Sequence, residues 1–524
     1  MWRFSPTNAH QPAGTEPEAG LFPGSPQRLT RRATAGAGWW ALANVVRQAL
    51  SLGAVAVLAR NLGSGPYGLI GMTSVALALL ICFRDFGTTS AIIQRPKISP
   101  ALLSTVFWAN LGLGLLLSLI TALLSGPVAL FFRTPQVAAI LRAQSVTFLF
   151  QSLGTVHYAI LIREMRFKVT ALADIASAIV GYSIAITMAL SGLGVWSLVA
   201  SLLSAPVVLA AVYWASSGWR PSLIFSREEL RGISGLSLNL FGSGLMDYFS
   251  STADNILVGR FLGTSPLGYY QMAYFLMMYP IQGVSSTLSQ ILLPAFSKIQ
   301  SDSCRMAEAY VRSCSLIALI TFPVIAGMGV VSGPLISAVL GPKWLPVIPV
   351  FRVLALIGVF QSVEITVRHI YVAKGRTDWL FRVRAFTTCV LVLAFLVGVR
   401  SGIRGVAVAY ATVYFSLILY PSLAFAFRLI DLSVAHFARQ LWPQIMITGV
   451  MVASCAGWQW FLSRAAVTNS WIQLISSILV GVCTYGLLLW RLRPPAISYA
   501  EDALSQLAFG PARWAASVLR RAAL

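Results

Sequence analysis

Apolar residues fill almost all of the chain from Gly36 to Trp490, in runs of about twenty residues separated by short polar segments. A helix of that length, at ~1.5 Å per residue, crosses the ~30 Å hydrocarbon core of a bilayer. The pattern therefore predicts an all-α polytopic membrane protein that works within the bilayer. About fourteen spans are predicted, at 36–59, 67–93, 101–132, 138–162, 169–190, 193–215, 231–258, 267–297, 308–332, 345–370, 379–399, 402–427, 441–463 and 469–490. The run 101–132 exceeds one crossing, and we expect an interfacial turn near Pro127.

One polar segment occurs twice. Arg60-Asn-Leu-Gly-Ser-Gly-Pro-Tyr-Gly68 returns as Arg260-Phe-Leu-Gly-Thr-Ser-Pro-Leu-Gly268, and each copy joins one apolar run to the next. Six spans separate the copies, an even number, so the two halves have the same topology. Parallel repeats of this kind occur in secondary transporters, whose substrate site lies between the halves. Chance recurrence of glycine and proline turns remains the alternative.

The repeat divides the chain into two pseudo-symmetric lobes of six helices each. The predicted parts are a disordered cytoplasmic tail (1–35), a first lobe (36–215), a cytoplasmic linker (216–230), a second lobe (231–430), two C-terminal helices (431–492) and a cytoplasmic amphipathic tail (493–524). The first part has no apolar core of a signal peptide. The last part alternates apolar and basic residues, which is typical of a helix lying on the inner leaflet.

Charge sets the orientation. Only 10% of the residues are charged, and the net charge is +22. With both termini in the cytoplasm, 28 of the 38 Lys and Arg residues fall in inner segments and 8 in outer ones. This bias is expected of a multi-pass membrane protein and argues against nucleic acid as the partner of the basic residues. The six cysteines are scattered without metal-ligand spacing, so neither a metal nor another cofactor is expected.

Several segments resemble the polysaccharide exporters of the WzxC type, within the multidrug/oligosaccharidyl-lipid/polysaccharide (MOP) superfamily. They are the run from Tyr248 to Tyr274, which contains Asp-Asn-Ile-Leu-Val-Gly-Arg-Phe-Leu-Gly, together with Ile162-Arg-Glu-Met-Arg-Phe167 and Asp85-Phe-Gly87. The resemblance implies two six-helix lobes around a cavity that opens alternately to either side. It also implies flipping of undecaprenyl-diphosphate-linked oligosaccharide across the bacterial inner membrane, with a polymerase and a co-polymerase as possible partners.

Three charged residues are candidates for substrate binding. Arg47 lies in the middle of the first span, where a charge costs ~2.5–3.5 kcal/mol, and Asp247 occupies the equivalent position of the seventh. Arg47 suits a pyrophosphate because the guanidinium is a planar fork of donors. An Arg47–Asp247 ion pair that only holds the lobes together remains open. Arg352 is a second phosphate contact or snorkels to the headgroups.

Other polar residues in or near the spans are candidates for ion binding or gating. Asp254 and Asn255 bind a coupling cation or sugar hydroxyls, or form a cap or hinge. Glu364 and Arg368 have the i, i+4 spacing of an ion pair within one helix, which we favour over substrate contact. Arg60 and Arg260 begin the repeated turns and snorkel or act as a gate. Asp85 completes this set.

Two further groups have simpler interpretations. Asp174 and His157 are predicted to be isolated in their spans, and His157 to be a packing residue. Five tryptophans near the span ends are predicted to anchor the protein at the membrane interfaces, although stacking on sugars remains open: Trp39, Trp40, Trp108, Trp196 and Trp344.

Other functions are less consistent with these residues. A drug exporter or a lipid II exporter of the same superfamily is the nearest alternative. A membrane enzyme such as a polysaccharide polymerase needs paired carboxylates or a His/Asp group near a large outer loop, and the outer segments here are short. No Gly-rich loop precedes Lys-Ser/Thr, so ATP is not the expected energy source. A Na⁺ or H⁺ gradient, the membrane potential or removal of product would drive transport.

Overall fold

The computed structural model describes residues 26–84, 88–95, 98–234 and 237–506, and within these residues it contains helices and turns but no strand. The first lobe and the linker comprise α1 (Pro26–Leu62), α2 (Ser64–Ile81), α3 (Thr88–Gln94), α4 (Pro100–Phe132), α5 (Gln136–Ser145), α6 (Thr147–Arg163), α7 (Phe167–Leu190), α8 (Val195–Ser217) and α9 (Arg227–Ser234).

The second lobe and the C-terminal part contain more breaks. Their elements are α10 (Ser237–Leu262), α11 (Thr264–Lys298), α12 (Ser303–Val330), α13 (Ser332–Leu335), η1 (Ile336–Leu340), η2 (Pro342–Trp344), α14 (Val347–Glu364), η3 (Ile365–Val367), α15 (Arg368–Ala373), α16 (Thr377–Gly398), η4 (Val399–Ser401), α17 (Gly402–Val413), η5 (Tyr414–Ile418), α18 (Leu419–Phe427), η6 (Arg428–Ile430), α19 (Val434–Arg464), α20 (Ser470–Leu492) and α21 (Pro495–Gln506). Of these, η1 and η5 are turns of π-helix.

The predicted polytopic all-α fold is confirmed. Eleven stretches of described residues are long and apolar enough to cross a membrane, and one of them, 377–430, contains α16, α17 and α18. α10 and α11 include positions outside the described side chains. The number of fourteen spans therefore stays a prediction.

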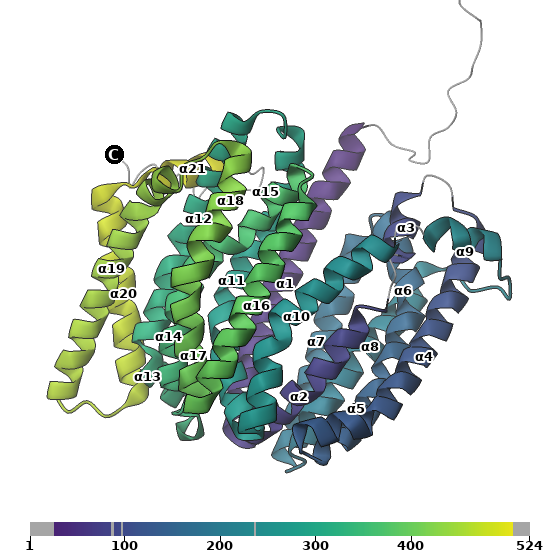
Figure 1. Cartoon of the computed structure of the whole chain (residues 1–524), viewed down its shortest axis with the longest axis horizontal. Helices are drawn as coiled ribbons and strands as arrows, with labels where there is room; N and C mark the ends of the chain where they lie inside the picture. The colour runs from purple at the N-terminus through teal and green to yellow at the C-terminus, as the bar shows by residue number, and fades with distance from the viewer. Residues whose placement is uncertain (1–25, 85–87, 96–97, 235–236, 507–524) are drawn as a thin grey trace, which may run out of the picture.

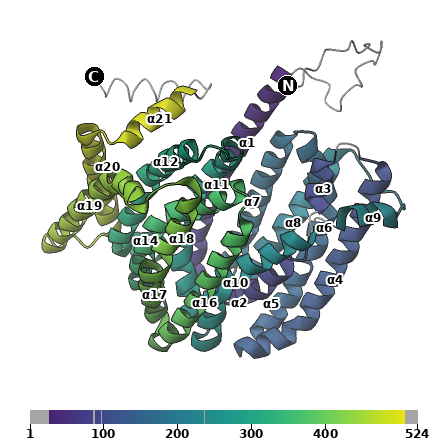
Figure 2. The same cartoon turned by 45° about the horizontal axis from the view of Figure 1, so that its top comes forward.

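Two groups of helices stand side by side (Figure 1). Helices α2 to α8 form one group and α10 to α18 the other, while α19 and α20 flank the second group next to α12. The long helix α1 packs along α7 and also contacts α11 and η1, so it touches both groups. Figure 2 shows α21 lying across the top of α12 and α20, where Arg312 stacks on the ring of Tyr499 at 5.0 Å.

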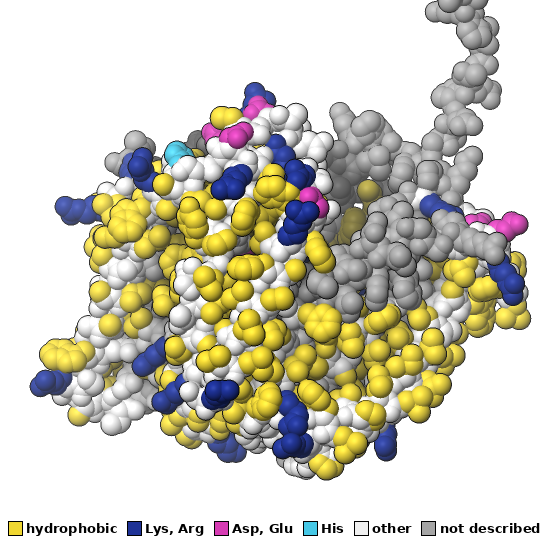
Figure 3. Space-filling model, in the orientation of Figure 1, with side chains coloured by type: hydrophobic (Ala, Val, Ile, Leu, Met, Phe, Trp, Pro, Cys, Tyr) yellow, Lys and Arg dark blue, Asp and Glu magenta, His cyan; other side chains and the backbone are white. Residues whose placement is uncertain are grey.

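The surface has the polarity of a membrane protein. Figure 3 shows apolar side chains over the middle of one face, with Lys and Arg side chains toward both ends. We call the end that carries Gly63 and Gly263 the outer end, because the charge bias predicts that it faces away from the cytoplasm. The opposite end, with α9 and α15, is the inner end.

Some predicted boundaries were wrong. The first predicted span, 36–59, agrees with the apolar stretch Gly38–Leu62, and the helix that contains it, α1, extends back to Pro26, a residue well suited to a first helical turn. α4 continues through Pro127 without the expected turn, because membrane helices tolerate proline where neighbouring groups satisfy the freed carbonyl. α2 ends at Ile81, before the predicted residue 93. Residues 1–25 and 507–524 of the two tails lie outside the described residues.

Candidate functional site

The two copies of the repeated turn meet at the outer end. A side-chain carbon on Gly68 would overlap the backbone carbonyl of Thr264, and one on Gly268 would overlap that of Ser64. These contacts are reciprocal, since each glycine lies over the first residue of the opposite helix. Gly63 and Gly263 precede the two helices with φ of +71° and +90°, a conformation that favours glycine. The repeat therefore builds a close contact between the lobes.

Arg60 fastens the end of α1 to the second lobe. Its Nε donates to the carbonyl of Val339 at 2.9 Å, and an Nη donates to the carbonyl of Ala338. Both acceptors belong to η1, on the other side of the contact between the lobes. A snorkelling arginine would direct these donors to lipid headgroups, so the geometry favours the gating interpretation of Arg60.

Trp344 lies at the centre of the same contact. Its ring is fully buried, and its Nε1 donates to the carbonyl of Ala59 at 2.8 Å. The rings of Tyr67 and Tyr269, one from each lobe, meet it edge-on at 5.4 and 5.9 Å. The prediction of an interfacial anchor was wrong for Trp344, because the contact between the lobes removes it from lipid.

Arg260, the counterpart of Arg60, also points to the opposite lobe but makes a different contact. Its guanidinium lies 5.8 Å from the ring of Phe131 at the end of α4. The neighbouring Gly259 abuts Phe132. Each lobe thus extends an arginine from its first helix to the other lobe, Arg60 to η1 and Arg260 to the end of α4.

Arg47 has an exposed side chain near the seam between the lobes. Its Nη2 donates to Asn44 Oδ1 at 3.0 Å on the same helix. The guanidinium acts electrostatically on Asp174 of α7 and on Tyr279 of α11, which belong to different lobes. Among the described side chains, no ion pair joins Arg47 to Asp174. The side chain of Asp247, the predicted partner of Arg47, lies outside the described residues.

The residue after Arg47 connects α1 to the second lobe. The Tyr279 hydroxyl donates to the Gln48 carbonyl at 2.6 Å, and the Gln48 amide abuts Gly283. α1 packs against α7 along much of its length. Arg47 is therefore held on a helix that contacts both lobes.

A polar cavity of about 380 Å³ lies within the second lobe, between α10, α11, α14, α16 and η5. The Glu364 carboxylate lines it and accepts a hydrogen bond from Ser422 Oγ at 2.7 Å. Arg368 also lines the cavity, but among the described residues no ion pair joins it to Glu364. The predicted pair within one helix is therefore not formed, since the Glu364 carboxylate is engaged by Ser422.

Three polar atoms of this cavity lack a protein partner. The Gln361 Oε1 and the hydroxyls of Tyr371 and Tyr414 are buried without a hydrogen bond in the described structure. Buried polar groups are normally satisfied, so these atoms leave hydrogen-bonding capacity in the cavity for a polar ligand. Tyr371, Tyr414 and Ser422 could not be predicted as cavity residues, because the π-helical turn that contains Tyr414 cannot be recognised from residue patterns.

Asp254 and Asn255 lie beside this cavity rather than on its wall. The Asp254 carboxylate is buried and accepts hydrogen bonds from the Tyr270 hydroxyl at 3.1 Å and from the Asn255 N–H at 2.7 Å. Its partners are therefore protein groups, as expected of a structural carboxylate. Asp85, the remaining acidic candidate, lies outside the described residues.

Arg352 and His157 are separate from these groups. Arg352 Nε donates to Ser332 Oγ at 3.0 Å and lines a cavity of about 770 Å³ between α12, α14 and α19. That cavity is on the side of the second lobe facing α19, so Arg352 and Arg47 do not share a cavity among those described. His157 is buried, with Nδ1 at 2.7 Å from Ser217 Oγ. Among the described side chains no cluster of three metal-ligating residues occurs.

Comparisons with known proteins agree with this architecture. The chain is 28% identical over 392 residues to the lipopolysaccharide biosynthesis protein WzxC of Escherichia coli, covering 74% of this chain and 79% of the relative. It is 28% identical over 332 residues to the succinoglycan biosynthesis transport protein ExoT of Rhizobium meliloti, covering 63% and 67%. Against the teichuronic acid biosynthesis protein TuaB of Bacillus subtilis, identity is 25% over 373 residues, covering 70% and 76%.

Solved structures share the fold. The lipid II flippase MurJ in an inward closed conformation superposes with a TM-score of 0.69 at 16% identity, covering 86% of this chain and 97% of that one. An inward-facing multidrug transporter of the MATE family, in the MOP superfamily, gives a TM-score of 0.59 at 16% identity, covering 75% and 100%. These likenesses show that the chain has the fold of these transporters, as predicted.

The comparisons favour a transporter over a membrane enzyme, as the short outer segments predicted. The relatives act in the biosynthesis of surface polysaccharides, and one is named a transport protein. A family model for polysaccharide biosynthesis proteins matches residues 57–349, which include both copies of the repeated turn and more than half of the chain. The chain therefore belongs to the polysaccharide biosynthesis protein family.

Proposed function

We propose that this protein flips undecaprenyl-diphosphate-linked oligosaccharide repeat units from the inner to the outer leaflet of the bacterial inner membrane. Alternating access between the two lobes moves the headgroup, and the repeat units then enter surface polysaccharide. The family and the named relatives support polysaccharide as the product class. A polymerase and a co-polymerase would take the flipped units, since export is of use only when it feeds assembly.

The observation that carries this proposal is the guanidinium of Arg47. It is exposed on a membrane-spanning helix that contacts both lobes, and in the described structure its hydrogen bond goes to a neutral amide, on Asn44. A charge at that depth needs water or an anion, and a diphosphate supplies several acceptor oxygens in the geometry of the guanidinium fork. A drug exporter would not require this anion contact.

The experiment combines a deletion strain with variants of Arg47. Deletion is expected to trap undecaprenyl-linked repeat units on the cytoplasmic side, measured by lipid extraction and mass spectrometry. Arg47→Ala should reproduce the trapping with normal protein in the membrane, and Arg47→Lys should restore export in part, because an ammonium keeps the charge without the fork. Normal export in Arg47→Ala would reject the site. Accumulation of lipid II instead of repeat units would assign the protein to the alternative substrate.

The cavity around Glu364 is our candidate for ion coupling by Na⁺ or H⁺. It offers a carboxylate and unpartnered polar oxygens of Gln361, Tyr371 and Tyr414 in one enclosed space. Any coupling requires that ion occupancy change the preference between two conformations. Glu364→Gln should abolish the dependence of proteoliposome transport on an imposed gradient of one of these ions. Unchanged dependence on both gradients would exclude Glu364 as the coupling residue.

Both termini are proposed to face the cytoplasm, on the basis of the distribution of Lys and Arg. Cysteines introduced near Arg28 and Arg513 should then react with maleimide only after the inner membrane is permeabilised. A cysteine at Asn469, between α19 and α20, should react in intact spheroplasts. The reverse pattern would invert the proposed direction of transport.

A further inference from the structure

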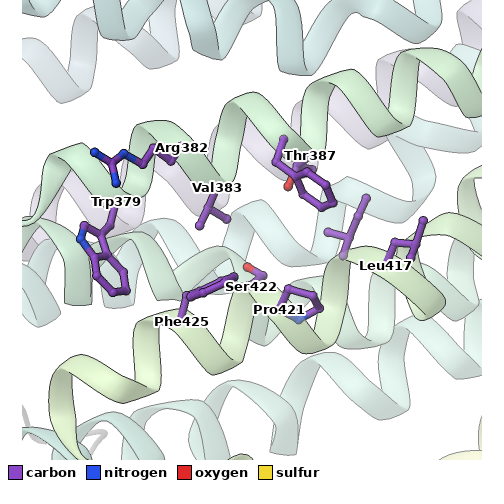
Figure 4. Close-up of a pocket in the computed structure, with 10 residues that line it drawn as sticks. Trp379, Arg382, Val383, Thr387, Leu417, Pro421, Ser422 and Phe425 are labelled. Atoms are coloured by element: carbon purple, nitrogen blue, oxygen red, sulfur yellow. The ribbon is translucent and has the colours of Figure 1, made fainter.

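A groove of about 470 Å³ opens on the lipid-facing side of the second lobe, between α16 and the segment formed by η5 and α18 (Figure 4). Its wall is apolar, and it is separate from the seam that carries Arg47. Phe386 and Leu417 are 52% and 46% exposed, although both belong to a membrane-spanning stretch. The wall is formed by Val383, Phe386, Leu417, Ile418 and Pro421. Such a surface is filled by an apolar chain in the bilayer.

One end of the groove is aromatic and basic. The rings of Trp379 and Phe425 face each other across it, 6.2 Å apart and edge-on. Arg382 lines the groove beside Trp379, as Figure 4 shows, and the guanidinium of Arg428 lies 5.6 Å from the Phe425 ring. This end belongs to the inner end of the molecule, at the depth where aromatic residues meet headgroups.

Two of the charges at this end are not neutralised by protein. Arg376 is paired with Asp378 at 3.2 Å. In the part of the chain that the structure describes, neither Arg382 nor Arg428 forms an ion pair. A largely apolar groove with Arg382 on its wall, and with Arg428 next to the lining residue Phe425 at the same end, is complementary to a molecule with an acyl chain and an anionic headgroup.

We propose that this groove is a binding site for an anionic glycerophospholipid of the inner leaflet. Arg382 and Arg428 hold its phosphate, and one acyl chain lies along Leu417 and Phe386. Both arginines lie at the end of the groove that faces the inner leaflet. This position favours a lipid that stays in the inner leaflet over the transported substrate, because the headgroup of the substrate must move to the outer leaflet. This inference does not depend on the proposed substrate.

The site has a consequence for the interior of the lobe. Val383, Thr387, Ile418 and Ser422 line both this groove and the polar cavity of Glu364, so the two spaces share a wall. Ser422 is the residue that donates to Glu364. An acyl chain bound in the groove would therefore contact Ser422, whose hydroxyl donates a hydrogen bond to the Glu364 carboxylate on the other side of the shared wall.

The test measures lipid retained by the full-length protein. Purified protein is placed in nanodiscs of equal phosphatidylglycerol and phosphatidylcholine, and the lipids that stay bound are counted by native mass spectrometry. The wild-type protein should retain phosphatidylglycerol preferentially. Arg382→Gln/Arg428→Gln should reduce that preference by about tenfold, because two charges near the headgroup are removed. Arg400→Gln/Arg404→Gln, which removes two exposed arginines at the outer end, is the matched control and should leave the preference unchanged.

A second pair of variants tests the groove without changing charge. Leu417→Trp fills the groove and should also reduce retention, whereas Leu393→Trp, at an exposed position of α16 outside the groove, should not. Equal retention in wild type, the arginine variant and Leu417→Trp would overturn the proposal. Displacement of phosphatidylglycerol by undecaprenyl phosphate at equal concentration would overturn it in favour of the substrate tail. If the preference for phosphatidylglycerol were seen only in a dimer and were lost when the dimer dissociates, the groove would be assigned to contact with a second copy of the chain, and the proposal would be overturned.

Discussion

The two copies of the repeated turn have nearly the same backbone but make different contacts with the opposite lobe. Gly63 and Gly263 adopt the same left-handed conformation, and Gly68 and Gly268 contact each other's helix starts reciprocally. Arg60 hydrogen-bonds to two carbonyls of η1, whereas Arg260 stacks on Phe131. The repeat therefore specifies a symmetric backbone contact. The residues that Arg60 and Arg260 meet in the opposite lobe determine how strongly each copy of the turn is held there.

This difference suggests how the outer end opens. Two hydrogen bonds from a charged donor to backbone carbonyls contribute more than a cation stacked on an exposed aromatic ring. The Arg260 side should separate more easily than the Arg60 side, where Trp344 adds a buried hydrogen bond. Opening would then proceed as a hinge about the end of α1.

Removing the close contact should have the largest effect. Gly68→Val and Gly268→Val each place methyl groups against a backbone carbonyl that cannot retreat, so the outer end cannot close. We expect export to fall by about tenfold or more with normal protein in the membrane, in line with overpacking costs of about 1–3 kcal/mol. Gly112→Val, at a position with open space around it, is the control. Wild-type export in both variants would show that the contact is dispensable.

The two arginines should differ in a direct comparison. Arg60→Ala leaves two carbonyls unpaired and should destabilise the closed outer end by about 1.5–3 kcal/mol, against about 0.5–1 kcal/mol for Arg260→Ala. A cysteine introduced at Gly65, between the lobes, should react with maleimide only when the outer end opens. Its labelling rate is measured in the Arg60→Ala and in the Arg260→Ala variant. Equal labelling rates in the two variants would contradict the asymmetry of the hinge.

Trp344→Phe is expected to have a smaller effect than Arg60→Ala. A phenyl ring stays between Tyr67 and Tyr269, while the hydrogen bond to Ala59 and part of the buried indole volume are lost. We expect a loss of about 0.5–1.5 kcal/mol in thermal unfolding, with export nearly intact. Trp196→Phe, at an exposed position, should leave stability unchanged. A larger loss at Trp196 than at Trp344 would show that burial at the lobe contact adds no stability.

Much of the fold follows from hydropathy, because the bilayer requires apolar helices of set length. The repeated turn also indicated that the first span of one lobe corresponds to the first span of the other. The contacts across the lobes could not be predicted in the same way. Trp344 looks like an interfacial anchor in the sequence, and its burial depends on a partner helix almost three hundred residues away. Ser422 as the partner of Glu364 likewise depends on how α14 and α18 pack, rather than on spacing within one helix.

The most direct test of the account is a reversible crosslink across the outer end. A side-chain carbon at position 65 would lie 3.8 Å from the Ser265 Oγ, which suits a disulfide in Gly65→Cys/Ser265→Cys. Oxidation should stop export and trap lipid-linked repeat units on the cytoplasmic side, and reductant should restore export, with each single cysteine variant unaffected. Undiminished export by fully crosslinked protein would contradict transport by separation of the two lobes.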